Sequence, residues 1–580
     1  MKWITRPNIR VNRTANGIVL TLLILAIIVV RSVSGDGENP VHGGSVVVAI
    51  SSDPGGLNPA TTTQGGVHLI CGSVFSGLVA HDFNLNPVPD LAESWEVSTD
   101  GRTYSFHLAR GAVFHDGAPV TSEDVRFTFE ELLLKFHARA RASVGDNLRR
   151  ISTPDPHTVV FEFDRPYAAF LQLVDVTNAP VMPRHLYEGT DPLTNPHNTR
   201  PVGSGPFKFQ EWLKGDHLTL ARNEKYFRKG KPYLERVVYK VMPSASMAAI
   251  AFEKGEVDYF LNPSPLDVAR LRDVPGVAIT DKGREGYAIV ETLIPNLTRE
   301  PLSDLPVRRA MAHAIDKDFL VDKLLFEMGA PATGPVSRML GWAYNPDVDK
   351  YEHNLALANR LLDEAGHRRG EGGVRFRLKF VHASSYAKVA EALRDQLREV
   401  GIGVDLQQME FAAAVDAVYI KKDFDLGFAS FENGPDPDIG VKRTVVSSNI
   451  GPIPFSNGAG YRNQRVDELF ALAASELDRQ RRATYYFEAQ DILVKDVAYF
   501  WLYEPKGASA YRQGLRGMYA WSAKSNIYFA RDAWWADGGR SPQTSADLPT
   551  RRGLYLLIAL VVLVSLTVVA VALSRRRRRG

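Results

Sequence analysis

The chain has 580 residues, of which 45% are hydrophobic and 23% are charged, and its formal net charge is +3. This composition is typical of a globular protein with room for two or three domains. It argues against a nucleic-acid-binding protein, because outside a concentrated basic tail the Lys and Arg residues are mixed with acids.

The N-terminal segment has the pattern of an export signal. Met1–Asn16 contains basic residues and no acid, and Gly17–Val30 is an apolar run of fourteen residues. That run has the length of a signal-peptide core and is short for a membrane span. Small residues at 33–35 suit a signal peptidase. We therefore expect residues 1–43 to be a cleaved signal peptide, with an uncleaved anchor as the alternative.

The most informative stretch is Pro87–Glu130, which reads as short elements joined by tight turns. Leu91–Val97 is apolar around a tryptophan, and Thr103–Leu108 alternates polar and apolar residues as a strand does. Ala112–His115 predicts another short strand. A helix is expected to begin at Thr121, whose hydroxyl caps the first free amides.

This stretch resembles the signature of the family 5 extracytoplasmic solute-binding proteins, which capture peptides, nickel and related solutes for ABC importers. We interpret His115 and Asp116 as turn residues and not as a catalytic pair, because adjacent side chains on a turn point apart. The matching residues are Pro89, Leu91, Ala92, Glu93, Ser94, Trp95, Asp100, Gly101, Phe106, Leu108, Gly111, Phe114, His115, Asp116, Gly117, Pro119, Glu123, Asp124 and Val125.

The resemblance implies an α/β, two-lobed periplasmic-binding-protein fold of the class II type, with an extra small α+β domain. The apolar runs near both ends of the sequence add terminal membrane segments to this expectation. A binder of this type closes two lobes over its solute by hinge bending. The expected parts are 44–80, 201–292 and 509–535 for the first lobe, 81–200 for the extra domain, and 293–508 for the second lobe.

Sequence patterns outside the signature fit an α/β body. Ser45–Ile50 predicts a strand, and Val237–Val241, Ser244–Phe252 and 257–259 predict strand, helix and strand in succession. This order implies a parallel sheet with right-handed crossovers. Residues 201–209 form a Gly/Pro turn that leads into a strand, without the Lys-Ser or Lys-Thr pair of a P-loop. Helices are expected at Asp304–Met328, Ala387–Val400 and Val466–Asp496.

A loop in the second lobe carries the predicted ligand contacts. Phe424–Phe428 predicts a strand that runs into an acidic Gly/Pro loop ending at Gly440. In peptide-binding relatives a carboxylate of this loop pairs with the amino terminus of the peptide, and Glu432 or Asp436 occupies the matching place. The alternative is a solvated turn whose acids bond their own backbone. The other predicted ligand contacts are Asn433, Gly434, Asn58 and Trp521.

The C-terminal segment predicts a membrane anchor. Residues 536–553 read as a flexible tether, and Leu554–Leu573 is an apolar run of twenty residues, which as a helix spans about 30 Å. Arg575–Arg579 follows at once and is costly to translocate. We expect a transmembrane helix over 554–574, a cytoplasmic tail over 575–580, and an extracytoplasmic body at the cell membrane.

These observations predict a membrane-anchored binding protein that captures a peptide-like solute and delivers it to the permease subunits of an ABC transporter. One alternative is a receptor that signals through a membrane partner, and another is an extracytoplasmic hydrolase that uses the acids of the loop. The sequence has no nucleophile motif and no histidine grouping at metal-ligand spacing, so we expect neither an enzyme nor a metal or cofactor. The single cysteine, Cys71, is expected to be buried.

Overall fold

The computed structural model describes residues 39–283, 288–519 and 525–538. The predicted signal segment up to residue 38, most of the tether, the membrane helix, the basic tail and Trp521 lie outside the described residues. Within the described part of the chain, no helix is both long and apolar enough to cross a bilayer. The described residues from His42 onward belong to one compact unit.

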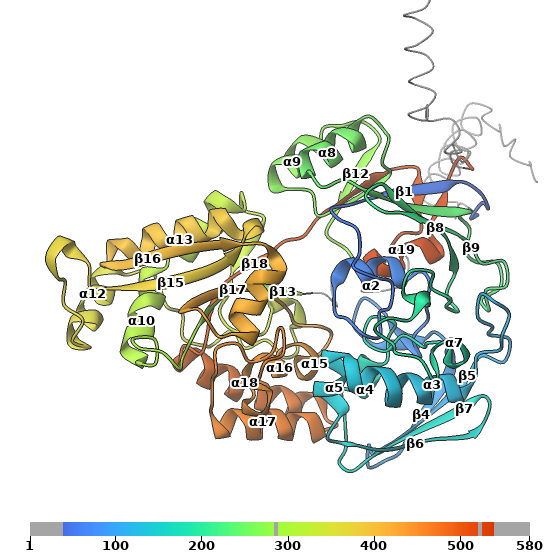
Figure 1. Ribbon diagram of the computed structural model, residues 1–580, viewed down its shortest axis with the longest axis horizontal. Helices are drawn as coiled ribbons and strands as arrows, with labels where there is room; N and C mark the ends of the chain where they lie inside the picture. Colours follow the sequence, from blue (N-terminus) through green and yellow to red (C-terminus); the bar gives the residue numbers. More distant parts are fainter. Residues whose placement is uncertain (1–38, 284–287, 520–524, 539–580) are drawn as a thin grey trace, which may run out of the picture. The chain divides into compact units, whose positions relative to one another are not determined.

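A seven-stranded mixed sheet has the strand order β12-β19-β11-β1-β10-β9-β8 (Figure 1). At its centre β1 pairs in parallel with both β10 and β11, as the strand–helix–strand order predicts. The outer pairs are antiparallel, so the expectation of a parallel sheet is right only for the central strands. The strands are β1 (Ser45–Ile50), β8 (Phe207–Leu213), β9 (His217–Arg222), β10 (Arg236–Val241), β11 (Tyr259–Leu261), β12 (Val277–Thr280) and β19 (Ser509–Arg512).

Three separate chain segments build this sheet. β1 comes from the start of the body, β8 to β12 from the middle, and β19 from near its end. The helix α8 (Ala245–Glu253) connects β10 to β11, and Ser244 is its N-cap. Both ends of this helix lie one residue from the predicted limits, Ser244 and Phe252. The expected domain boundaries themselves stay predictions.

A smaller antiparallel sheet carries the signature stretch, in the order β4-β5-β7-β6. Its buried face packs aromatic rings, with the centroids of Phe106 and Phe161 5.8 Å apart. The strand predicted at Ala112–His115 is wrong, since this segment forms only an isolated bridge between Val113 and Pro119. The strands are β4 (Ala92–Val97), β5 (Thr103–Leu108), β6 (Leu148–Asp155) and β7 (Thr158–Phe163).

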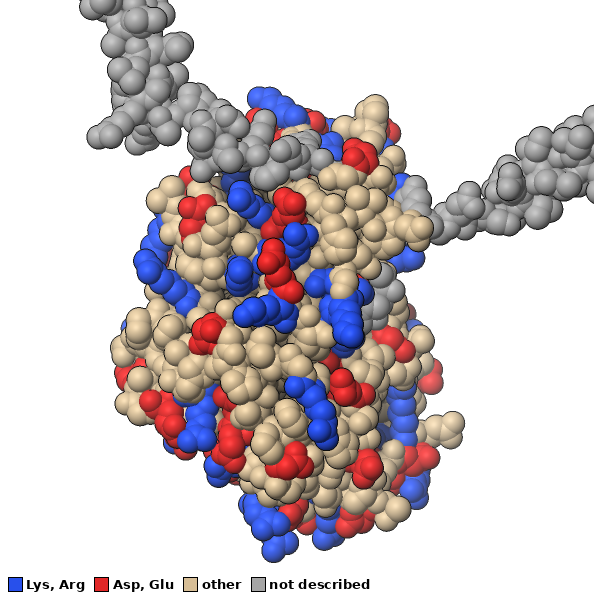
Figure 2. Space-filling view, turned by 90° about the vertical axis from the view of Figure 1, so that its right-hand side faces the viewer, with Lys and Arg blue, Asp and Glu red and all other residues tan. Residues whose placement is uncertain are grey.

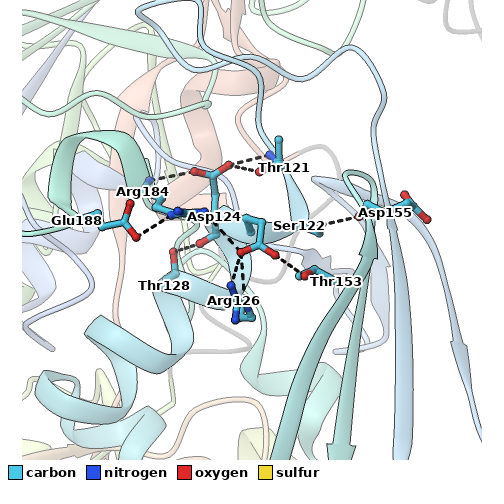
Figure 3. A network of polar contacts seen from close by, with 10 residues as sticks. Thr121, Ser122, Asp124, Arg126, Thr128, Thr153, Asp155, Arg184 and Glu188 are labelled. Carbon is cyan, nitrogen blue, oxygen red and sulfur yellow. Dashed lines mark hydrogen bonds and ion pairs between the residues drawn. The ribbon is translucent and has the colours of Figure 1, made fainter.

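The signature ends in the helix α3 (Ser122–Phe127), whose N-terminus holds several segments together (Figure 3). Asp124 accepts from the Thr121 amide at 2.8 Å and from the Arg184 amide at 3.0 Å, one bond to each carboxylate oxygen. The Ser122 hydroxyl donates to the Asp155 carbonyl at 2.6 Å. These bonds satisfy free amides at the start of α3 and join this helix to β6. This part of the signature therefore has a structural role.

The second large sheet has six strands, in the order β14-β18-β13-β17-β15-β16. β15 runs parallel to β16 and β17, and β13 runs antiparallel to β17 and β18. The helix α13 (Ala387–Glu399) lies along β15 and β16 (Figure 1). The strands are β13 (Ile289–Pro295), β14 (Gly329–Pro331), β15 (Phe376–Ala383), β16 (Ile402–Met409), β17 (Leu426–Glu432) and β18 (Phe500–Pro505).

Two long predicted helices are interrupted in the structure. The region predicted helical at Asp304–Met328 contains α10 (Leu305–Ala314), a short helix whose cap is Asp316, and a π-helical turn. The region predicted at Val466–Asp496 contains α17 (Gln464–Ser475) and α18 (Arg479–Lys495). In each region an Asp side chain accepts a hydrogen bond from a backbone amide in the first turn of the second helix, from Phe319 to Asp316 and from Arg481 to Asp478. Such capping favours a new helix start over a continuous helix.

The chain passes between the two larger sheets after β12 and again after β18. Each passage is short, from Thr280 to Ile289 and from Pro505 to Ser509. Most buried hydrophobic residues cluster around one larger sheet or the other, although Ile439 belongs to the cluster of the seven-stranded sheet and Leu85 to that of the six-stranded sheet. Two short connections between the sheets are compatible with the hinge that the resemblance implies.

Candidate functional site

A cavity of about 510 Å³ lies at the carboxyl ends of the parallel strands of the seven-stranded sheet. Ile50 ends β1, Met242 follows β10 and Leu261 ends β11, and all three line this space, which we call the first cavity. In open α/β sheets, ligands bind outside the carboxyl ends of the strands. The opposite wall includes Arg139 from the extra domain and Glu432 from the six-stranded sheet.

Glu432 is the last residue of β17 and forms an ion pair in this cavity. Its Oε2 accepts from Nη2 of Arg139 at 2.9 Å, and the two side chains are 14% and 4% exposed. Arg139 lies on α5 (Ala138–Val144), and its Nη1 donates to Oδ1 of Asn178 at 2.8 Å. Asn178 in turn donates to Asp175, so the guanidinium is held from two sides.

The predicted strand before this site is displaced along the sequence. Phe424–Phe428 was expected, whereas β17 runs from Leu426 to Glu432 because it pairs along its whole length with β13. Glu432 therefore projects from the end of a strand and not from a flexible loop. A group on a strand end is positioned more firmly than one on a loop.

Asn433 and Gly434 shape the turn after β17. Nδ2 of the Asn433 side chain donates to the carbonyl of Pro335 at 3.0 Å, and its Oδ1 accepts from the backbone amide of Ser337 at 2.5 Å. Gly434 has φ +64°, a conformation that glycine adopts without strain. Asn433 thus fixes the turn against the segment 335–337, and a direct contact of either residue with a solute stays a prediction.

Asp436 has different surroundings from Glu432. It is 2% exposed, and its two carboxylate oxygens accept from Arg482 at 2.9 and 3.0 Å. It also accepts from the Asp438 amide and so caps α15 (Pro437–Gly440). Burial lowers the pKa of Arg482, but Asp436, Tyr486 and Asp438 together raise it above its usual value. Whether a solute contacts Asp436 or Glu432 stays a prediction, and the geometry favours Glu432.

The remaining predicted contacts lie elsewhere or cannot be placed. Asn58 is buried, donates to Oδ1 of Asn198 at 3.0 Å and accepts from the Ala60 amide, so its side chain fixes the loop after β1. It is not among the residues that line the first cavity. Trp521 lies outside the described residues.

His115 and Asp116 bond separate partners, as the turn interpretation predicts. Nε2 of His115 donates to the Gly205 carbonyl at 3.1 Å, and its Nδ1 accepts from the Gly203 amide. Burial lowers the pKa of His115 to about 4, so the ring is neutral at physiological pH. Asp116 bonds His185 at 2.7 Å.

Arg139 is a cavity-lining residue that sequence reasoning missed. It is separated from Glu432 by 293 positions, and it lies in the run ARARAS, which has no motif character. The nearby His137 caps α5 by accepting from the Ala140 amide at 3.2 Å. Burial holds the pKa of His137 well below its usual value, so this ring adds no charge beside Arg139.

Comparisons with known proteins agree with this architecture. A family model described as bacterial extracellular solute-binding proteins, family 5 Middle, matches residues 86–451. The oligopeptide-binding protein AppA of Bacillus subtilis is 28% identical and is aligned over 90% of this chain and 99% of its own. Protein XP55 of Streptomyces lividans is 30% identical over 79% of this chain and 83% of its own.

A solved structure extends this likeness to three dimensions. AppA of Bacillus subtilis in complex with a nonapeptide superimposes with a TM-score of 0.75 at 27% identity, covering 86% of this chain and all of that one. The α/β periplasmic-binding-protein fold is thereby supported over the whole described body. The chain belongs to the family 5 bacterial extracellular solute-binding proteins of ABC importers.

Proposed function

We propose that this protein captures a peptide-like solute in the first cavity and delivers it to an ABC permease from the outer face of the cell membrane. The observation that carries the proposal is the position of Glu432, which faces the carboxyl ends of β1, β10 and β11 across the cavity. As a member of a family of binding proteins the chain is not an enzyme, which removes the hydrolase alternative.

Glu432 is proposed to receive the ammonium group of the solute. A carboxylate in a nearly buried site forms a charge-assisted hydrogen bond worth about 1.5–3 kcal/mol. Nη2 of Arg139 donates to one of its oxygens at 2.9 Å. The ammonium group replaces or joins this guanidinium, and Asn178 keeps Arg139 in place. The carboxylate that lines the cavity is thus the proposed contact for a cation of the solute.

The membrane attachment is also proposed. It is supported by the apolar run Leu554–Leu573 and the arginines that follow it. A helix of this length spans the hydrocarbon layer, and arginines at its end favour the cytoplasmic side. The body is then held beside the permease, which raises its effective concentration there.

Calorimetry on the full-length chain in detergent tests the solute site. The probes are tetra-alanine and its N-acetylated form, which lacks the ammonium group. We expect acetylation to weaken binding about tenfold or more, and Glu432→Gln to weaken binding of tetra-alanine by a similar factor. Glu364→Gln, an exposed change on α12 (Leu355–Glu364), serves as the matched control. Unchanged affinity in Glu432→Gln would show that this carboxylate does not bind the solute.

A further inference from the structure

Two apolar side chains are buried in a core to which the rest of their own segment does not belong. We call the seven-stranded sheet, the small sheet and the core that they share the first body, and the six-stranded sheet with its core the second body. Leu85 comes from the first body and belongs to a hydrophobic cluster of the second. Ile439, on α15 of the second body, belongs to the cluster of the first. The two residues are 7% and 1% exposed, and we call this pair the clasp.

Leu85 lies at the tip of a hairpin whose strands belong to the first body. The strands are β2 (Val79–His81) and β3 (Pro87–Pro89), which pair antiparallel. Ala80 and Leu91, on either side of the tip, are buried in the core of the first body. Only the tip of the hairpin therefore joins the core of the second body.

Hydrogen bonds fix the shape of this tip. The Asp82 carboxylate accepts from the backbone amides of Asn84 and Asn86, each at 2.8 Å. Nε2 of Gln172 in the first body donates to the Leu85 carbonyl at 3.0 Å. The tip is thus braced from its own body, and it presents the Leu85 side chain in a defined position.

The backbone of Leu85 is strained. Its φ of +62° lies in the left-handed region, which glycine and asparagine enter readily and a leucine rarely does. Such strain persists only where the surroundings hold it, and it marks positions where a function outweighs the cost. At this tip the side chain itself gives the reason, because a leucine fills the core of the second body and a glycine could not.

Ile439 makes the reverse contact from α15, which packs against α5. Two hydrogen bonds also join the bodies. The Tyr167 hydroxyl donates to Oδ2 of Asp438, the residue before Ile439, at 3.0 Å. The Ala168 amide donates to the Ala474 carbonyl, also at 3.0 Å. The apolar exchange is therefore accompanied by directional contacts, which fix how the two bodies face each other.

Neither Leu85 nor Ile439 lines the first cavity. The walls of this cavity come from both bodies, since Ile50 belongs to the first and Glu432 to the second. A contact that holds the bodies together therefore acts on the position of the walls and not on the solute.

We propose that the clasp positions the two walls of the first cavity and thereby sets the affinity and the lifetime of the solute complex without touching the solute. This inference rests on the proposed function. A solute that bridges both walls binds only the arrangement in which they face each other, so its apparent affinity falls with the population of that arrangement. Release requires the walls to separate, so weakening the clasp accelerates dissociation.

Cross-linking measures the arrangement of the bodies without any solute. Asn84 of the first body and Gln480 of the second are exposed and line one groove of about 620 Å³. In the full-length chain in detergent, the double variant Asn84→Cys, Gln480→Cys is treated with a flexible bismaleimide, and buried Cys71 does not compete. We expect Leu85→Asn to slow the cross-linking at least about threefold and Leu85→Met to leave it unchanged. Asparagine suits the left-handed backbone but cannot fill an apolar core, whereas methionine can fill it.

Peptide binding then measures the effect on the solute. Leu85→Asn should weaken the binding of tetra-alanine about tenfold in calorimetry, because losing a buried leucine contact changes an equilibrium constant by this order. The change should lie mainly in faster dissociation, measured by stopped-flow displacement. The preference for tetra-alanine over its N-acetylated form should stay the same, because the clasp lies outside the first cavity. Ile439→Ala should act in the same direction, and it decides the question if Leu85→Asn does not fold.

Two leucines of the first body serve as controls. Leu213, the last residue of β8, is 57% exposed, and β8 lies on the side of the molecule away from the six-stranded sheet (Figure 1). Figure 2 shows this side, on which basic and acidic side chains are interspersed. Leu213→Asn should leave cross-linking and affinity unchanged. Leu108 is buried on β5, so Leu108→Ala should lower the thermal midpoint without changing the affinity for tetra-alanine.

The outcomes separate this inference from the proposed function. Unchanged affinity for tetra-alanine in folded Leu85→Asn and in folded Ile439→Ala overturns the clasp and leaves peptide capture intact. A changed preference for the free amino terminus in Leu85→Asn also overturns it, because Leu85 would then contact the solute. If the parent chain binds neither peptide, peptide capture fails, and cross-linking alone decides whether Leu85 holds the bodies together.

Discussion

Asp436 and Glu432 belong to one short segment, yet their carboxylates have different partners. Asp436 is bonded by both terminal nitrogens of buried Arg482, whereas Glu432 is bonded to Arg139 at the edge of a cavity. Removing one member of a buried ion pair leaves the other charge uncompensated and costs about 3–5 kcal/mol. We expect Asp436→Asn to lower the free energy of unfolding by this amount, measured by denaturant titration. A loss below about 1 kcal/mol would contradict the buried pairing.

The thiol of Cys71 should be unreactive in the folded protein. Cys71 is fully buried, as the sequence predicts, and its Sγ lies 3.6 Å from the Leu57 carbonyl. Burial raises the pKa of this thiol, so the nucleophilic thiolate is scarce. Iodoacetamide should therefore leave the native chain unmodified and label it after unfolding, as mass spectrometry will report. Rapid labelling of the native chain would contradict this burial.

Glu291 should make stability depend on pH. Burial raises the pKa of Glu291 to about 7 from 4.5, although the Ser430 hydroxyl acts in the opposite direction. Between these values the folded state keeps a proton that the unfolded state loses, so stability falls as pH rises through this range and levels off above it. The linked change is at most about 3 kcal/mol.

The variant Glu291→Gln isolates this contribution. Its loss of stability between pH 4.5 and pH 8 should be smaller than that of the parent chain by about 1–3 kcal/mol. Denaturant titration at the two pH values measures the difference, and Glu364→Gln should behave as the parent does. A parallel pH dependence in Glu291→Gln and the parent would show that folding does not raise the pKa of this carboxyl.

At the scale of elements, the turn before β8 requires glycine for close packing. A Cβ on Gly203 would lie 2.0 Å from the carbonyl oxygen of Val74, which is backbone and cannot rotate away. Gly203→Ala should therefore destabilise the protein by about 2 kcal/mol or more, measured as a shift in thermal midpoint. Gly111→Ala is the control, because a Cβ there meets nothing within 4 Å. Equal midpoints for the two variants would contradict the close approach.

Local patterns predicted many single elements well. β1 and β5 begin and end at the residues expected, and α8 and α13 agree within a residue of their limits. The errors arise where distant partners decide the outcome. β17 extends to Glu432 because β13 pairs with it, and pairing between strands so far apart in sequence leaves no local pattern.

At the scale of the whole molecule, the sequence could not predict how the site is assembled. The acidic segment and its role follow from the resemblance to relatives, which brings Glu432 and Asp436 to notice. Their separation into a cavity residue and a buried structural residue depends on Arg139 and Arg482, which no motif marks. The charged lining of the first cavity therefore depends on the packing of the sheets and α5, which no local sequence pattern predicts.

The proposed anchor predicts how the whole protein fractionates. A chain truncated after Pro549 lacks the apolar run and the arginines that follow. We expect the full-length chain to stay with membranes in alkaline carbonate and the truncated chain to be released, with peptide affinity equal in both. Release of the full-length chain by carbonate would contradict a spanning anchor.

The position of β19 has a consequence for export. This strand is the last of its sheet to be synthesised, yet it lies between β11 and β12 and hydrogen-bonds to both. Until Arg512 has left the translocation channel, the facing edges of those two strands have no partner, and open strand edges promote aggregation. The nascent protein therefore passes through a long interval in which an extracytoplasmic chaperone is of greatest use, and a premature stop before Ser509 leaves that sheet unfinished.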